Sequence, residues 1–206
     1  MLHSAGGQEE GALRVISGIA RGRRIIPVPG DGTRPITDRV KESLFDILGA
    51  DVIDARLLDL FAGTGAVGIE ALSRGAAHVT FVDRSHKAVR TIHRNLEITG
   101  LSERAHVLQQ DAFRYLEQAD AAAQYEYIYV APPQYQELWA KALRALNDRP
   151  LLTADGEIIV QIHPREWHAV ETPNLSLLDE RHYGSTALFF YRLSQAGLRK
   201  QEDPGG

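Results

Sequence analysis

An acidic residue followed by a glycine-rich loop is the stretch of this sequence best suited to binding a ligand. Asp59 lies near the end of an apolar run, and Gly63, Gly65 and Gly68 follow it. Glycines let the backbone turn sharply and come close to a ligand, where a Cβ atom would obstruct the approach. The Gly-x-Gly-x-x-Gly spacing fits a dinucleotide-binding fingerprint, although it also fits a purely structural turn of an α/β protein. The pattern predicts a strand, a tight turn and a helix.

Two further acids follow later apolar runs and indicate that the ligand is a nucleoside. Asp83 ends the run that begins at His78, about 20 residues beyond the glycines, which is the spacing of an acid that holds ribose hydroxyls. Asp111 ends the run that begins at Ala105, where a carboxylate can accept a hydrogen bond from an adenine amino group. On these residues alone, a nicotinamide dinucleotide and S-adenosylmethionine both remain candidates.

A double proline follows the fourth apolar run, in the sequence Ala131-Pro132-Pro133-Gln134-Tyr135. Proline fixes φ and has no N–H, so the loop is stiff and its carbonyls can accept hydrogen bonds from an exocyclic amino group. Tyr135 can stack on a flat base; the structural alternative is a proline pair that only ends a strand, with Tyr135 buried. Because open α/β sheets bind ligands at the carboxyl ends of their strands, we expect Asp59, Asp83, Asp111 and this loop to surround one crevice.

Arginines concentrate near the start of the chain, although the chain is acidic overall. The stretch Leu13–Ile26 has β-branched residues broken by glycines and is expected to form a β-hairpin, followed by a helix from about Asp38. Arginine forks suit phosphate oxygens, so this region is expected to form a phosphate-binding patch. Solvated charges that protect a sheet edge are the alternative. The residues assigned to this surface are Arg14, Arg21, Arg23, Arg24, Arg34 and Arg39.

The order of the elements predicts the fold class. Apolar runs and amphipathic helical patterns alternate from about residue 57 to residue 162, and two more strands follow around Gly184. This order predicts an α/β fold with a mostly parallel, doubly wound sheet edged by an antiparallel C-terminal hairpin. We expect four segments: a disordered tail (1–12), a basic hairpin-and-helix extension (13–50), the ligand-binding domain (51–193) and a flexible tail (194–206).

The composition excludes several classes of protein. With 206 residues, 44% of them hydrophobic, the chain can bury one full core, and no apolar run is long enough to cross a membrane. The lack of cysteine removes disulfides, thiolate metal sites and covalent catalysis through cysteine. The histidines form no convincing metal set, and a net charge of −4 restricts nucleic-acid binding to a local patch. We expect a cytoplasmic monomer without a metal.

Several blocks of residues carry a resemblance to a known family. They are Arg14–Arg24, Thr33–Phe45 and Asp59–Gly75, with His182–Thr186 near the end. Through them, from about residue 13 to Tyr191, the chain resembles the bacterial small-subunit (16S) ribosomal RNA guanine-N2 methyltransferases. The glycine loop is common to all class I methyltransferases, whereas the first two blocks are more specific. The resemblance implies a Rossmann-like, seven-stranded sheet, S-adenosylmethionine as cofactor, and 16S ribosomal RNA or the small ribosomal subunit as partner.

The resemblance also implies roles for individual residues. The double-proline loop would receive the target base, which makes Ala131, Pro132, Pro133 and Tyr135 the candidate catalytic residues. The cofactor would lie over the glycine loop, with Asp83 on its ribose and Asp111 near its adenine. The implied cofactor-binding residues are Asp59, Phe61, Ala62, Gly63, Thr64, Gly65, Gly68, Asp83, Arg84, Asp111 and Ala112.

The proline loop departs from the family pattern. Family members usually carry Asp or Asn before the two prolines and an aromatic residue directly after them, whereas this chain has Ala131, Gln134 and only then Tyr135. The side-chain acceptor for the amino group is therefore missing, while the Pro132 carbonyl remains. Two alternatives stay open: a non-catalytic or altered-target RNA-binding member of the family and, from another class, a nicotinamide dehydrogenase.

Overall fold

Seven strands form one sheet in the order β3-β2-β1-β4-β5-β7-β6. The computed structural model describes residues 13–30, 36–120 and 122–202. Strands β1 to β5 pair in parallel, and β7 runs antiparallel to both of its neighbours, β5 and β6. The predicted fold class is confirmed. The strands are β1 (Arg56–Leu60), β2 (His78–Asp83), β3 (Ala105–Gln109), β4 (Tyr125–Val130), β5 (Leu152–Ile162), β6 (Leu175–Tyr183) and β7 (Thr186–Leu193).

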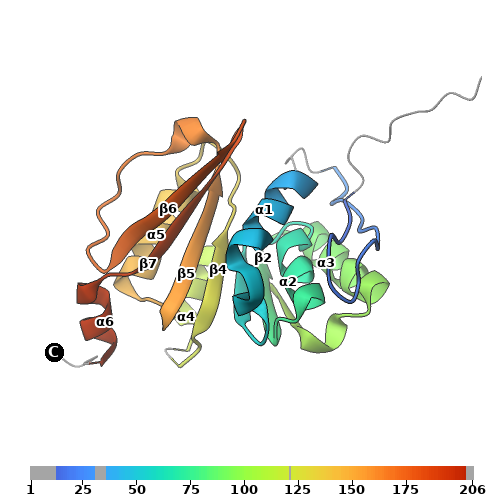
Figure 1. Ribbon diagram of the computed structural model, residues 1–206, viewed down its shortest axis with the longest axis horizontal. Coiled ribbons are helices and arrows are strands. Elements are labelled where there is room, and N and C mark those ends of the chain that lie inside the picture. The colour runs from blue at the N-terminus through green and yellow to red at the C-terminus, as the bar shows by residue number, and fades with distance from the viewer. Residues whose placement is uncertain (1–12, 31–35, 121, 203–206) are drawn as a thin grey trace, which may run out of the picture.

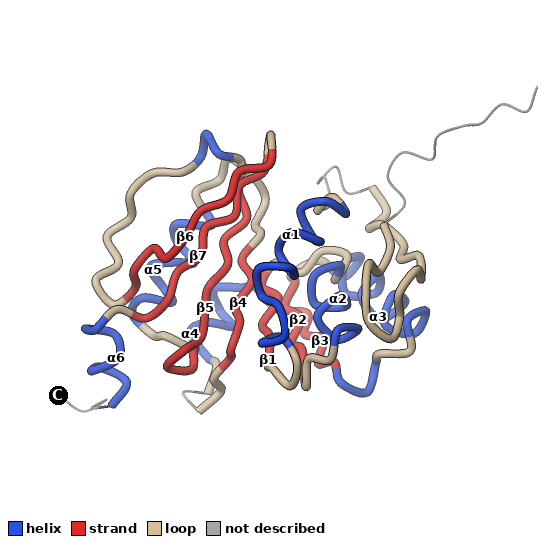
Figure 2. Tube along the Cα trace, viewed as in Figure 1, coloured by secondary structure: helices blue, strands red, loops and turns tan. Residues whose placement is uncertain are grey.

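Helices cover both faces of the sheet, as Figure 1 and Figure 2 show. On one face, α1, α2 and α3 share a core cluster with inward residues of the strands, such as Leu57, Tyr129 and Phe190. On the other face, α4 and α5 share a second cluster with Leu58 and Ile158. The helices are α1 (Asp38–Leu48), α2 (Ala66–Arg74), α3 (His86–Thr99), α4 (Ala112–Gln118), α5 (Leu138–Asp148) and α6 (Gln195–Glu202), with 3-10 turns at η1 (Gly49–Val52), η2 (Ser102–Arg104) and η3 (Pro164–Glu166).

Glycines set how closely α2 approaches the sheet. The helix begins after Gly65, whose φ of +75° is left-handed, and it ends at Gly75, whose φ is +113°. A Cβ atom on Gly68 would lie 2.3 Å from the Phe81 ring of β2, so only glycine fits between helix and strand. The glycine pattern therefore brings the start of α2 directly behind the end of β1.

The predicted β-hairpin over residues 13–26 is a hairpin-shaped loop in the structure, with one isolated bridge between Arg14 and Arg24. Its two arms share backbone hydrogen bonds, from the N–H of Val15 to the carbonyl of Arg23 and from the N–H of Ile25 to the carbonyl of Leu13, both at 2.9 Å. The N–H groups of Ile16 and Ser17 donate to the carboxylate of Glu70, at 2.8 and 2.9 Å. Because the N–H groups of Ile16 and Ser17 already have side-chain partners, the pairing between the two arms stays short.

Residues 13–30 and α1 belong to the same core as the sheet. Val15, Ala20 and Ile25 are buried in the cluster that contains α2 and α3. The core thus runs across the predicted boundary at residue 50, and the extension is docked on the ligand-binding domain. The predicted tail 1–12 and Arg34 lie outside the described residues.

Most of the segment predicted as a flexible C-terminal tail forms α6. The Ser194 hydroxyl accepts a hydrogen bond from the N–H of Gly197 at 3.2 Å, and Leu198 packs against the second core cluster. The ammonium of Lys200 donates to the backbone carbonyl of Asp148 at 3.0 Å. Figure 1 shows α6 and the blue N-terminal segment at opposite ends of the molecule.

Candidate active site

A cavity of about 840 Å³ lies at the carboxyl ends of the parallel strands. It is bordered by the residues that follow β1, β2, β3 and β4, by the end of β5, and by residues 27–30 of the N-terminal segment. The structure thus brings together the acids, the glycine loop and the proline loop that the sequence placed at strand ends. Of the implied cofactor-binding residues, only Gly65 and Gly68 lie outside the cavity lining, where they shape the start of α2.

The glycine loop is tied to the acid that follows β2. The N–H of Gly63 donates to one carboxylate oxygen of Asp83 at 2.9 Å, and the N–H of Ser85 donates to the other at 2.8 Å. Each carboxylate oxygen has further lone pairs, so a held carboxylate can still accept hydrogen bonds from a ligand. Asp83 therefore presents a fixed pair of acceptors to the cavity, as ribose binding requires.

Asp59 lies deeper in the same cavity and is nearly inaccessible to solvent. Its carboxylate accepts a hydrogen bond of 3.1 Å from the N–H of Gly68. Burial raises the pKa of Asp59 to about 7; the bond from Gly68 works against this shift, and the nearby charge of Asp83 adds to it. A buried acid poised near neutrality responds strongly to a cationic group placed beside it.

Asp111 caps α4, so it has a structural role in addition to the predicted one. One of its carboxylate oxygens accepts hydrogen bonds from the N–H groups of Phe113 and Arg114, at 2.9 and 3.2 Å. Capping holds the carboxylate at the cavity wall beside Ala112. Adenine recognition by Asp111 stays a prediction.

The proline loop lines the cavity, but Tyr135 does not. Ala131, Pro132 and Pro133 border the cavity. Tyr135 is 67% exposed, with a left-handed φ of +59°, and its N–H donates to the Glu166 carboxylate at 2.5 Å. Its ring centroid lies 5.8 Å from that of His163. In this arrangement Tyr135 borders the proline loop from outside and does not stack over the cavity.

A pair of hydrogen-bonded polar residues in the cavity was not singled out from the sequence. Tyr129 of β4 and Gln161 of β5 both line it, and the Tyr129 hydroxyl donates to the Gln161 side-chain oxygen at 2.5 Å. The sequence signal that could have identified them is a polar side chain at a strand position whose neighbours on the same face are apolar. The other unexpected lining residues are Pro27, Val28, Pro29, Gly30, Ile36, Ser85, Lys87, Val82, Leu138, Ala66 and Val67.

The described arginines that were assigned to the phosphate-binding surface lie on the N-terminal segment and at the start of α1, exposed to solvent. Arg14 forms an ion pair with Asp38 at 2.8 Å, and a guanidinium nitrogen of Arg23 donates to the carbonyl of Ile98 at 2.5 Å. Both side chains remain exposed, as do those of Arg21, Arg24 and Arg39. Lys41, which clusters with these arginines in the sequence, is instead fully buried.

Lys41 belongs to a buried charge cluster centred on Glu70. The Lys41 ammonium lies 3.5 Å from the Glu70 carboxylate and also donates to the backbone carbonyl of Arg14. Arg74 pairs with the same carboxylate at 2.9 Å. Burial lowers the pKa of Lys41, and the charge of Glu70 opposes that shift. Lys41 thus links the backbone of the N-terminal segment to Glu70 of α2 and holds the segment against that helix.

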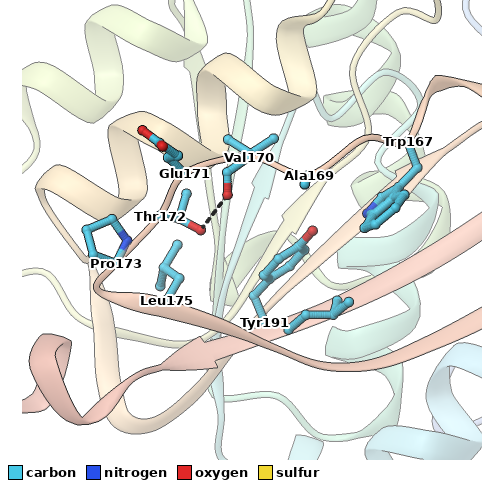
Figure 3. A pocket seen from close by; sticks show the side chains of 9 residues that line it. Trp167, Ala169, Val170, Glu171, Thr172, Pro173, Leu175 and Tyr191 are labelled. Atoms are coloured by element: carbon cyan, nitrogen blue, oxygen red, sulfur yellow. Dashed lines mark hydrogen bonds between the residues drawn. The ribbon is translucent and has the colours of Figure 1, made fainter.

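A second cavity of about 570 Å³ lies between the loop 167–175 and the C-terminal hairpin (Figure 3). Trp167, Leu175 and Tyr191 point into it, and the Thr172 hydroxyl turns back to the carbonyl of Val170 at 3.4 Å. None of the residues selected from the sequence lines it. Within residues 13–30, 36–120 and 122–202, no helix is long and apolar enough to cross a membrane, and no cluster of three acidic or histidine side chains is arranged to hold a metal ion.

Comparison with known proteins identifies the family. The model of the family described as "Conserved hypothetical protein 95" matches residues 13–192. The chain belongs to this family. A putative rRNA methyltransferase, YlbH of Bacillus subtilis, is 43% identical over 185 residues, which covers 87% of this chain and 98% of the relative. Ribosomal RNA small subunit methyltransferase D of Escherichia coli is 35% identical over 202 residues, which covers 98% of this chain and 96% of that protein.

Comparison with solved structures also finds a methyltransferase. A putative methyltransferase from Escherichia coli, yhhF, superposes with a TM-score of 0.77 at 34% sequence identity, covering 89% of this chain and 99% of the other. The resemblance found in the sequence is therefore confirmed at the level of the family and of its class I methyltransferase fold. The methyltransferase names of these relatives give no support to the dehydrogenase or the non-catalytic alternative.

Proposed function

We propose that this protein methylates the exocyclic N2 amine of a guanine in small-subunit (16S) ribosomal RNA, with S-adenosylmethionine as the methyl donor. The observation that carries the proposal is the single cavity in which the acid-anchored glycine loop faces the double-proline loop. The exposed arginines of residues 13–26 supply a basic surface on the segment whose next residues, 27–30, line that cavity. The relatives named as small-subunit rRNA methyltransferases support the same substrate class.

The cavity residues fit this cofactor. A cavity of about 840 Å³ accommodates a nucleoside with a side chain, and ligand pockets commonly have volumes of about 300–1,000 Å³. Asp83 would accept from the ribose hydroxyls, and Asp111 from the adenine amino group. Asp59, buried with a pKa of about 7, would be stabilised in its charged form by the cationic end of the cofactor. When bound, the cofactor supplies a methyl group already activated by a positively charged sulfur.

The protein's own part in the reaction is to position the amine and keep water out. Pro132 and Pro133 form a rigid wall whose carbonyls can hold the amino group of the base and orient its lone pair. A target guanine must leave its stack to enter the cavity, which costs a few kcal/mol and least in a loop or single strand. Contacts from the arginines to RNA phosphates would offset that cost. Water can take the departing proton.

Methyl transfer to undermethylated small-subunit particles tests the proposal. Tritium from labelled S-adenosylmethionine should appear in N2-methylguanosine on nucleoside analysis, and Asp83→Asn should abolish transfer by weakening cofactor binding. Absence of label from a protein that binds both cofactor and RNA would overturn the enzymatic assignment. Label in another nucleoside would overturn the guanine-N2 assignment alone.

The RNA surface has its own test in the salt dependence of binding. Replacing Arg21, Arg23 and Arg24 by glutamine should weaken RNA binding and reduce the slope of log K against log salt by about 0.7 for each phosphate that the variant no longer binds. Arg199→Gln is the matched control, because Arg199 is exposed on α6 at the other end of the molecule (Figure 1). An equal change in both variants would show that the N-terminal segment has no special role in binding.

A further inference from the structure

The base-receiving side of the cavity has a polar pair that no motif predicts. Ala131, before the two prolines, has no side-chain hydrogen-bonding group, and Gln134 lines the cavity with a largely exposed side chain for which the structure records no hydrogen bond among the residues it describes. Tyr129 and Gln161 instead bring a hydroxyl and an amide to the cavity from β4 and β5. We propose that Gln161, held in one orientation by Tyr129, is a specificity-determining residue that hydrogen-bonds the target guanine at O6. This inference rests on the proposed function.

Strand register places the two side chains together. Tyr129 pairs with Ile159, and Gln161 lies two residues further along β5, so all three side chains are on one face of the sheet. The Tyr129 hydroxyl lies 2.5 Å from the side-chain oxygen of Gln161. Tyr129 is buried, whereas Gln161 is half-buried and open to the cavity. Tyr129 is therefore held in the core, and Gln161 is within reach of a ligand in the cavity.

The hydrogen bond has a defined direction. In the structure the protonated Tyr129 hydroxyl donates to the side-chain oxygen of Gln161, and burial, with the charge of Asp59 as a smaller cause, raises the pKa of Tyr129 and so keeps that proton in place. Gln161 must then accept through its oxygen, which leaves both hydrogens of its Nε2 group for another partner. Within the described part of the chain, the Nε2 group has no hydrogen-bond partner. An oriented amide donor thus faces the cavity.

The position in the sheet separates Gln161 from the nucleoside end of the cavity. The acids Asp83 and Asp111 follow β2 and β3, whereas β5 lies on the other side of β1, beyond β4. Neighbouring strands lie about 4.8 Å apart, so two strand spacings separate β5 from β1 by about 10 Å. Gln161 is therefore adjacent to the proline loop and distant from the expected adenosine site.

An oriented amide donor can distinguish between purines. Guanine presents an acceptor, O6, where adenine presents an amino donor. The Nε2 group of Gln161 can donate to O6 and would meet a second donor in adenine. A free glutamine could rotate its amide to suit either base. In the structure the amide oxygen of Gln161 is already bonded to the Tyr129 hydroxyl, and this arrangement leaves the donor group available to O6.

Competition binding with the protein saturated with S-adenosylhomocysteine tests this inference without requiring turnover. The probes are short single-stranded RNAs of one sequence that carry guanine, inosine or 2-aminopurine at a single position. Inosine keeps O6 and lacks the N2 amine, whereas 2-aminopurine keeps the amine and lacks O6. We expect the native protein to bind the guanine RNA about tenfold more tightly than the 2-aminopurine RNA, as expected for one hydrogen bond of about 1.4 kcal/mol, while the inosine RNA reports separately the loss of the amine held by the proline loop.

The variants separate selectivity from folding and from cofactor binding. Gln161→Leu should reduce the preference for O6 to less than about twofold, with unchanged affinity for S-adenosylhomocysteine. Tyr129→Phe should retain binding to the guanine RNA and lose most of the discrimination. Gln109→Leu is the control, because Gln109 is exposed at the end of β3 and lies outside the cavity lining.

Two results would overturn the inference. One is a native protein that binds the guanine and 2-aminopurine RNAs equally, or a Gln161→Leu variant that keeps the native preference. The other is a Gln161→Leu variant that loses affinity for S-adenosylhomocysteine, which would place the amide at the cofactor. The proposed function fails separately, when the native protein transfers no methyl group to small-subunit particles.

Discussion

Asn95 of α3 donates a hydrogen bond of 3.0 Å to the backbone carbonyl of Thr64, in the glycine loop. The same amide group donates to the carbonyl of Ile26 at 3.0 Å, and its oxygen accepts from the N–H of Ile26 at 2.8 Å. One fully buried side chain therefore joins the basic N-terminal segment to the glycine loop, which borders the cavity of about 840 Å³. Residues on both sides of this junction, Thr64 and Pro27, line that cavity.

Asn95→Leu should weaken cofactor binding as well as stability. The substitution leaves three backbone groups without their partners, which should lower the free energy of unfolding by at least about 2 kcal/mol. Because Thr64 and residues 27–30 lose their common anchor, the affinity for S-adenosylhomocysteine should fall on the order of tenfold, as calorimetry would measure.

The control for this effect is another buried asparagine, Asn147, whose oxygen accepts a hydrogen bond of 2.8 Å from the N–H of Asn174. Asn147 does not line the cavity. Asn147→Ala should therefore reduce stability and leave cofactor affinity unchanged. Equal losses of affinity in both variants would show that Asn95 acts only through global stability.

Glu70→Ala should be among the most destabilising substitutions in the N-terminal half of the chain. It would leave Lys41 buried without its counter-ion and remove the acceptors of Ile16 and Ser17. Breaking a buried ion pair from one side costs about 3–5 kcal/mol. Urea unfolding should show this loss, whereas Glu97→Ala should cost less than about 1 kcal/mol, because the ion pair of Glu97 with Arg94 is largely exposed.

Gly18 and Gly22 form a matched pair of substitutions, because both have a φ of +80°. A Cβ atom on Gly22 meets nothing within 4 Å, so Gly22→Ala should cost only the left-handed backbone conformation, about 1 kcal/mol. A Cβ atom on Gly18 would lie 1.8 Å from the carbonyl oxygen of Ser73, which accepts the N–H of Ile19.

Gly18→Ala must therefore move the N-terminal segment away from α2. We expect the free energy of unfolding, measured with urea, to fall by about 3 kcal/mol or more. RNA affinity should fall with it, since the arginines would lose their fixed positions. Similar stabilities of the two alanine variants would contradict the docking of this segment.

Asp59 should make the stability of the cofactor-free protein depend on pH. Burial raises the pKa of Asp59 from 3.8 to about 7, so the folded state favours the protonated acid. The contribution of protonated Asp59 to the free energy of unfolding is complete below about pH 4 and is lost as the pH rises through about 7. Between pH 5 and pH 8, native protein should lose up to about 3 kcal/mol relative to Asp59→Asn, at about 1.4 kcal/mol per pH unit.

Urea unfolding of the native protein and the Asp59→Asn variant at several pH values would measure this difference. Asp46→Asn, at an exposed position of α1, is the control substitution. If the difference in stability between native protein and Asp59→Asn is the same at pH 5 and pH 8, the buried acid does not titrate in this range.

The sequence predicted the sheet and the acids at its strand ends because both are local. Each strand is a short apolar run, each acid lies within two residues of the end of its strand, and parallel strands bring their carboxyl ends to one edge. Asp59, Asp83 and Asp111 were therefore identified from spacing alone. The helix α1 was equally local, with Thr37 accepting a hydrogen bond from the N–H of Val40.

The parts that the sequence could not predict depend on contacts between distant residues. Glu70 has the pattern of a helical surface acid until Ile16 and Ser17 are placed against it, 54 and 53 residues away in the chain. Tyr129 and Gln161 have the pattern of ordinary strand residues until the register places them together. The exposed position of Tyr135 results from the left-handed conformation of the loop and its bond to Glu166, which no pattern of residue types reveals.

The docking of the N-terminal segment also constrains the order in which the chain acquires structure during synthesis. Ile26 is made 69 residues before Asn95, its hydrogen-bonding partner, and Ile16 is made 54 residues before Glu70. At a translation rate of about 5–20 residues per second, the basic segment waits several seconds for the helices that receive it. The N-terminal segment therefore cannot complete its contacts until α3 has been synthesised, and the arginine surface waits for the same helix.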